Sequence, residues 1–174
     1  MPIPANQFIF NPAHPAVVHF LRQINTPWKM WLYLWYKLPS AGFWGLRVRS
    51  CTISKGEVSI PFSWFTQNPF RSTYFAAQCG AAEMSTGMLA MAAIRGSGPV
   101  SMLVTQVEAV FTKKATGLVV FTCEEGQQII DAVERTVNSG EAQTITVTSV
   151  GVQQNNGQEV ARVRITWSCK GNGE

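Results

Sequence analysis

The sequence predicts an α+β protein in which an antiparallel sheet wraps around one long central helix. Strand-like segments with alternating apolar residues occupy 46–62, 100–124 and 144–168. A stretch of small apolar residues at 72–94 separates the first two segments, and a shorter amphipathic helix at 129–137 separates the last two. The 174 residues suffice for one domain with a sizeable core.

The N-terminal region is basic and rich in tryptophan. A Thr-Pro pair provides an N-cap and a first helical position, and Trp28, Trp31 and Trp35 follow at helical spacing, which predicts a helix over 26–38. This helix is apolar nearly all round. It therefore packs on its own domain, covers a ligand, or lies against a membrane surface or another interface.

We assign residues 1–44 to an N-terminal helical extension and 45–174 to the main domain. Within the main domain, a Ser-Lys-Gly turn at 54–56 predicts a hairpin over 46–62. An Asn-Asn-Gly turn at 155–157 predicts a second hairpin, formed by the two last strands.

The stretch 72–94 contains a single acidic or basic side chain, that of Glu83. Both Gln78 and Glu83 would be costly in hydrocarbon, so a membrane span is disfavoured. The small residues of this stretch permit close backbone approach, which favours a helix enclosed by a curved sheet.

Composition and motifs disfavour several classes of function. A net charge of +4 without any run of Lys or Arg argues against nucleic-acid binding. The four cysteines form no metal-ligand spacing, and no glycine-rich phosphate loop is present, so we expect neither a metal nor a cofactor. The two histidines, His14 and His19, lie in the extension and support no nucleophile pair. Three cysteines lie in apolar segments, and no leader-like segment opens the chain, so we expect reduced thiols and a cytoplasmic location.

The residues leading into the central helix resemble the signature of the hotdog-fold acyl-CoA thioesterases. That signature has an Asn, a Gly three residues later, a His-Gly pair three further on, and an acidic residue nine beyond the His. Asn68, Tyr74 and Glu83 stand at these spacings, with Arg71 at the Gly position and Phe75 after Tyr74. The resemblance is to a branch without assigned function that has an Asn-Pro-Phe-x-x-x-Tyr-Phe stretch here. It implies a hotdog fold and a homodimer with the site at the subunit boundary.

Thioester hydrolysis needs a base or nucleophile near the carbonyl carbon and donors near its oxygen. Glu83 is the candidate base or nucleophile, because burial on an otherwise uncharged helix raises a carboxyl pKa. The Phe75 amide at the helix start and Asn68 are candidate oxyanion donors, and Tyr74 could donate its hydroxyl. The resemblance also implies a water-holding hydroxyl on the next strand, for which Ser101 and Thr105 both stay open.

Other interpretations of these residues stay open as well. The bulk of Arg71, Tyr74 and Phe75 stands where a thioester must approach, which favours a non-catalytic acyl-chain or acyl-CoA binding module as the alternative to a thioesterase. Arg71 binds a CoA phosphate or merely faces water, and Asn68 is equally suited to a turn. Glu83 could instead be a buried carboxylate satisfied by hydroxyls or paired with Arg162.

The expected partners are therefore an acyl-CoA or other acyl thioester and a second copy of the chain. Nucleic acid is not expected. Weak contact with a membrane surface through the tryptophan-rich helix is a further expectation.

Overall fold

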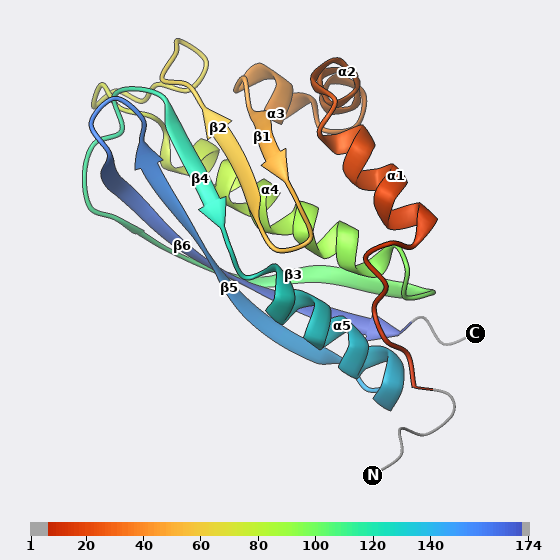
Figure 1. Cartoon of the computed structure of the whole chain (residues 1–174). Coiled ribbons are helices and arrows are strands. Elements are labelled where there is room, and N and C mark those ends of the chain that lie inside the picture. Colours follow the sequence, from red (N-terminus) through yellow and green to blue (C-terminus); the bar gives the residue numbers. More distant parts are fainter. Residues whose placement is uncertain (1–6, 172–174) are drawn as a thin grey trace.

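The structure is a computed structural model that describes residues 7–171, and it has the predicted α+β architecture. One antiparallel sheet of six strands curves around the long helix α4 (Figure 1). The first six residues of the predicted extension and the last three of the predicted main domain lie outside the described residues. The elements in chain order are α1 (Pro15–Ile24), α2 (Pro27–Lys37), α3 (Pro39–Phe43), β1 (Arg47–Cys51), β2 (Gly56–Ile60), α4 (Phe75–Ile94), β3 (Val100–Phe111), β4 (Val119–Cys123), α5 (Gly126–Ser139), β5 (Gln143–Gln153) and β6 (Gln158–Gly171).

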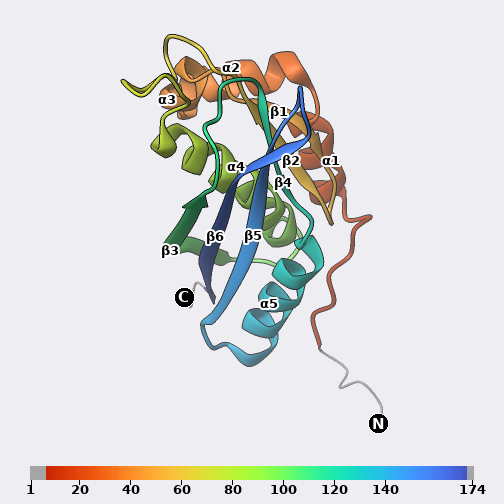
Figure 2. The ribbon, with the colours of Figure 1, turned by 90° about the vertical axis from the view of Figure 1, so that its left-hand side faces the viewer.

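The strands lie in the order β1-β2-β4-β5-β6-β3. Consecutive strands β3 and β4 are therefore not neighbours: β3 pairs with β6, whereas β4 pairs with β2 and β5. This leaves β1 and β3 as the two edges. The β1 edge contacts α1 and α2, while β3 forms the opposite, outer edge of the sheet (Figure 2).

Close packing of α4 on the sheet confirms the expectation drawn from its small residues. A Cβ added at Gly56 of β2 would lie 2.3 Å from the carbonyl oxygen of Ser85, so strand and helix touch through backbone. Two polar contacts fix the helix in place: the Ser85 and Ser149 hydroxyls lie 2.7 Å apart, and the Trp167 indole N–H donates to the Thr86 hydroxyl at 3.1 Å. The result is a rigid support for every side chain that α4 carries.

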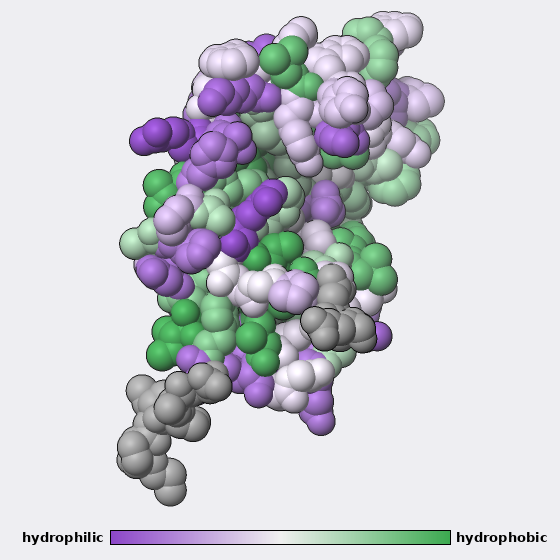
Figure 3. Space-filling view, turned by 90° about the vertical axis from the view of Figure 1, so that its right-hand side faces the viewer, coloured by the Kyte–Doolittle hydropathy of each residue, from purple (hydrophilic) through white to green (hydrophobic). Residues whose placement is uncertain are grey.

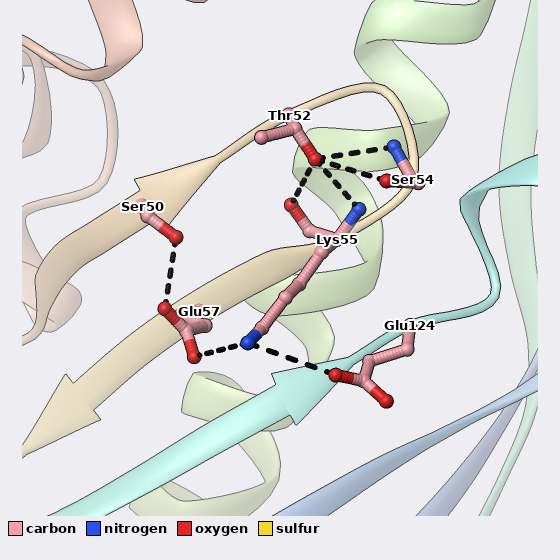
Figure 4. Close-up of polar contacts among 6 residues, drawn as sticks. All are labelled: Ser50, Thr52, Ser54, Lys55, Glu57 and Glu124. Atoms are coloured by element: carbon pink, nitrogen blue, oxygen red, sulfur yellow. Dashed lines mark hydrogen bonds and ion pairs between the residues drawn. The ribbon is translucent and has the colours of Figure 1, made fainter.

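The β1–β2 hairpin forms at the predicted turn (Figure 4). The Thr52 hydroxyl accepts from the amides of Ser54 at 3.3 Å and Lys55 at 3.0 Å, which closes the loop. The Lys55 ammonium then contacts the Glu57 carboxylate at 2.9 Å, on the following strand. Strand β2 ends at Ile60, two residues earlier than the sequence predicts, because a proline follows it and cannot donate to the ladder.

The later elements also follow the predicted turn signals. Helix α5 ends at Ser139 and is followed by Gly140, whose φ of 71° is the left-handed C-terminal cap expected of a glycine. The turn between β5 and β6 contains Gly157, with a φ of 68°.

Three helices precede the sheet, in the region assigned to the extension. Helix α2 begins at Pro27 after Thr26, as predicted, but Leu34 is its one fully buried residue in the described part of the chain. Phe20, Ile24, Leu34 and Ala41 from the three helices join the same apolar core as the sheet. The boundary between 44 and 45 stays a prediction. None of the helices in residues 7–171 is long and apolar enough to cross a bilayer.

Candidate functional site

Glu83 lies near the middle of α4, as its ninth of 20 residues, on a strip of the helix that the sheet does not cover. Seven residues on this strip are only partly buried, and four of them lack large side chains: Ala76, Cys79, Gly80, Glu83, Gly87, Met91 and Ile94. The sheet-facing residues of α4 are buried instead. The one carboxylate of α4 therefore lies on the side of the helix where α1 and α2 pack.

The Glu83 side chain lines an apolar cavity of about 530 Å³ between α4 and the helices α1 and α2. A volume of this size is typical of small-molecule sites. Methionine side chains from α4 and aromatic and aliphatic side chains from α1 and α2 form most of its wall. Lys29 and Arg95 also border the cavity, but neither comes within ion-pair distance of Glu83.

The Glu83 carboxylate has no ion-pair partner and no hydrogen-bond donor among residues 7–171. The alternative pairing with Arg162 does not occur, because the Arg162 guanidinium binds Glu159 through two hydrogen bonds of 3.0 and 2.8 Å. Burial raises the pKa of the Glu83 carboxyl above its ordinary range, since desolvation penalises the charged form. A carboxylate in this state is a better base than an exposed one.

The other candidate nucleophiles are less suitable. Cys79 lies one helical turn before Glu83, and burial raises the pKa of its thiol, which disfavours the reactive thiolate. His14 caps α1 by accepting from the Ala16 amide at 3.3 Å, and neither His14 nor His19 borders the cavity.

The start of α4 provides the second set of predicted groups. Phe75 is the first helical residue, and no side chain caps the helix there. The amides of its first turn have no carbonyl partner within the helix, so they form the positive end of its dipole. The Phe75 ring is more than half exposed and packs edge-on against the rings of Tyr74, at 4.8 Å, and Phe111, at 6.3 Å.

Asn68 and Arg71 shape the loop before this helix start. The Asn68 side-chain oxygen accepts from the amides of Phe70 at 3.0 Å and Ser72 at 3.2 Å, so Asn68 has the turn role that the sequence also allows. Its amide nitrogen makes no hydrogen bond among the described residues and can still donate outward. Arg71 is exposed and adopts a φ of 57°, the left-handed conformation that suits the glycine of the resembling signature.

Ser101 and Thr105 both lie on the edge strand β3 and are exposed. Their hydroxyls donate to carbonyl oxygens of β6, Ser101 to Lys170 at 3.2 Å and Thr105 to Thr166 at 3.3 Å. Thr105 sits where the β3–β6 register shifts, which is a bulge. Neither residue lines the cavity that contains Glu83.

One chain does not bring the two halves of the predicted site together. Asn68 and Phe75 line a separate hollow of about 350 Å³ that lies against the end of β3. Glu83 is eight residues beyond Phe75 on the same helix, which corresponds to a rise of about 12 Å at 1.5 Å per residue. A single small thioester group cannot span that distance within one subunit.

Comparison with known families decides the classification. The family model described as a domain of unknown function, DUF4442, matches residues 34–169 of this chain. The chain belongs to the DUF4442 family. Among curated proteins, none matches it in sequence.

Solved structures similar to this DUF4442 chain share its hotdog fold. A Pseudomonas aeruginosa protein of unknown function, described as a probable thioesterase, superposes with a TM-score of 0.70 at 16% identity, over 84% of this chain and 97% of that one. A Haemophilus influenzae thioesterase gives 0.56 at 12% identity, over 82% and 90%. The Escherichia coli PaaI protein of the phenylacetic acid degradation operon gives 0.58 at 12% identity, over 88% and 96%. At these identities the likeness establishes the fold.

Two features of the DUF4442 site were not anticipated from its sequence. The first is the cavity: the residues of α1 that form part of its wall follow no recognisable motif. The apolar character of α2 was the one sequence signal that indicated a covered ligand. Gln78 is buried near the start of α4, where its amide nitrogen donates to the Thr73 carbonyl at 3.0 Å while its side-chain oxygen has no partner among the described residues. Within residues 7–171, no group of three His, Cys, Asp or Glu side chains is placed to hold a metal ion.

Proposed function

We propose that this DUF4442 protein hydrolyses acyl thioesters such as acyl-CoA. The observation that carries the proposal is Glu83: a carboxylate without an ion partner among the described residues, with a raised pKa, on the wall of an apolar cavity. The thioesterase names of several hotdog relatives support the same reaction class. The cavity accounts for an acyl chain, and the carboxylate accounts for the chemistry at its end.

In the proposed reaction, the Glu83 carboxylate takes a proton from water as the water oxygen attacks the thioester carbonyl carbon, or attacks that carbon itself. The carbonyl oxygen becomes negative and accepts hydrogen bonds from the Phe75 amide and the Asn68 side-chain nitrogen. In the general-base route the C–S bond then breaks, and the leaving thiolate takes the proton held by Glu83. In the direct-attack route the C–S bond breaks to give the acyl-Glu83 anhydride, and the leaving thiolate takes its proton from water. Water afterwards hydrolyses this anhydride.

The separation of about 12 Å along the helix leads us to propose a site shared between two copies, since 1.5 Å per residue leaves no closer approach within one chain. The edge strand β3 presents exposed apolar side chains, and an uncovered edge of this kind is normally paired or covered. In our proposal, a second copy paired along β3 brings its own helix start to the cavity that Glu83 lines. Glu83 of one subunit would then face the Phe75 amide of the other.

The bulk of the Phe75 side chain favours a second candidate function, which is binding of acyl thioesters without hydrolysis. Its exposed ring stands beside the very amide that a thioester oxygen would need to reach. Binding of acyl-CoA without thiol release would establish this alternative.

Thiol release from a panel of acyl-CoAs of increasing chain length tests the proposal. Glu83→Gln keeps the shape of the side chain but removes the base, and we expect the rate to fall by about 10²- to 10⁴-fold. Glu141→Gln, an exposed carboxylate after α5, is the matched control and should retain full activity. Equal rates for wild type and Glu83→Gln would remove Glu83 from the mechanism.

The oxyanion donor can be removed without removing the helix. Proline is well tolerated at the first helical position, so Phe75→Pro deletes one N–H while preserving the turn. We expect it to lower the rate by about 10²- to 10³-fold. Phe75→Ala keeps the N–H and opens the approach, so it should match or exceed wild-type activity.

A further inference from the structure

One face of the molecule carries large apolar side chains that the fold leaves exposed. It comprises most of the outer surface of α2, the end of α3 and the tip of the loop between β2 and α4. We call it the aromatic face; its members are Trp28, Trp31, Leu32, Trp35, Tyr36, Phe43, Trp64 and Phe65. Trp28 and Trp31 are 63% and 59% exposed, and Trp64 is 78% exposed.

A chain of ring contacts links five members of the aromatic face across three segments. Trp31 lies 6.2 Å from Trp35 between ring centroids, and Trp35 lies 4.9 Å from Phe43. Phe43 then lies 6.0 Å from Phe65, which lies 5.1 Å from Trp64. A contiguous exposed apolar patch of this kind marks an interaction surface.

Basic side chains border the aromatic face. Lys29 and Lys37 of α2 place their ammonium groups 5.6 and 4.7 Å from the ring centres of Trp28 and Tyr36. The first 56 residues contain six Lys or Arg and no Asp or Glu. In Figure 3, which shows the side of the molecule to which α1 and α2 belong, residues of pale, intermediate hydropathy gather over the upper part and are broken by a few hydrophilic ones.

We propose that this protein docks on an anionic membrane surface through the aromatic face. Trp and Tyr rings prefer the headgroup region, where an apolar body and a polar N–H or O–H are both accommodated. The ammonium groups of Lys29 and Lys37 complement lipid phosphates at the same depth. Helix α2 is thereby an interfacial helix, lying on the bilayer instead of crossing it.

Docking in this way also orients the apolar cavity. Trp28, Leu32 and Tyr33 border the cavity and are at least 45% exposed, so its rim belongs to the docked surface. An acyl chain leaving the bilayer would meet the cavity without crossing bulk water. The membrane contact itself does not depend on the proposed hydrolysis, because Glu83 takes no part in it.

Vesicle flotation with the full chain tests the proposal, using phosphatidylcholine alone and phosphatidylcholine with one part in three of phosphatidylglycerol. We expect binding to the anionic vesicles, a blue shift of tryptophan fluorescence, and weakening at high salt. Trp28→Ala combined with Trp31→Ala should lower the partition coefficient about tenfold or more, because both rings leave the interface. Phe70→Ala removes an equally exposed ring outside the aromatic face and should leave partitioning unchanged.

Charge variants test the contribution of the two lysines to membrane binding independently of the tryptophans. Lys29→Glu with Lys37→Glu should lower binding to anionic vesicles by about fivefold per lysine or more. Lys113→Glu with Lys170→Glu makes the same change in net charge elsewhere and should have a much smaller effect. Absence of flotation with anionic vesicles at low salt would overturn the proposal. Equal partitioning of the wild type and the tryptophan double variant would also overturn it. The same holds if the double variant turns a stable oligomer into monomers while neither protein binds vesicles, because the aromatic face would then be a protein interface.

Discussion

Replacing Gly56 by alanine should disrupt the contact that positions helix α4 on the sheet. The new Cβ would lie 2.3 Å from the Ser85 carbonyl oxygen, about 1 Å closer than an ordinary van der Waals contact. Backbone cannot rotate away as a side chain can, so α4 must retreat from β2 by that amount. The retreat would also stretch the buried Ser85–Ser149 contact beyond its 2.7 Å hydrogen-bond length.

The expected loss is about 3 kcal/mol of unfolding free energy, the sum of overpacking and one buried hydrogen bond left unmade. For a chain of this size, that loss lowers the melting temperature by about 6 to 12 °C. Chemical denaturation followed by circular dichroism measures the loss of unfolding free energy. Gly171→Ala, where a Cβ would meet no atom of residues 7–169 within 4 Å, should change stability by no more than about 0.5 kcal/mol. Equal stability of the Gly56→Ala and Gly171→Ala variants would refute the close packing of strand and helix.

Three further outcomes follow from single side chains. Arg71→Gly should stabilise the fold by about 1 kcal/mol in urea unfolding, because the φ of 57° is strained for arginine and free for glycine; destabilisation would contradict this. Glu83 has a raised pKa in the folded state, so the stability it confers is fully present below its unfolded pKa and is lost as the pH rises through its folded pKa. The advantage of Glu83→Gln over wild type in melting temperature should therefore grow between pH 4 and pH 7, whereas Glu141→Gln should show no such trend. Trp167→Phe should cost about 1 to 2 kcal/mol, since it leaves the buried Thr86 hydroxyl without its 3.1 Å donor; an unchanged unfolding free energy would show that this bond contributes nothing.

Local sequence signals predicted most of the fold because they act over short distances. Turn glycines at 140 and 157 and the Thr-Pro pair before α2 each fix one boundary by their own backbone chemistry. The order of the strands in the sheet could not be predicted from such local signals. Strand β3 pairs with β6, more than forty residues away, and nothing in either strand's own pattern names its partner.

For the candidate site, too, the sequence predicted positions along a helix but not how distant elements pack. Spacing alone placed Glu83 on α4 and Phe75 at its start, since both depend on the helix period. Spacing could not show that the two residues line different hollows, because that depends on where α1, α2 and the edge strand pack. The sequence likewise could not predict that the Gln78 side-chain oxygen lacks a partner among the described residues, because this depends on the residues packed around it.

Mixing the Glu83→Gln and Phe75→Pro variants tests the proposed shared site most directly. Glu83→Gln retains a complete helix start, and Phe75→Pro retains the carboxylate, so a mixed dimer of the two contains one site with both groups. The two variants, unfolded and refolded together, should recover thiol release well above the level of either refolded alone. Activity that stays at the level of the separate variants, although mixed dimers have formed, would contradict a site built from two subunits.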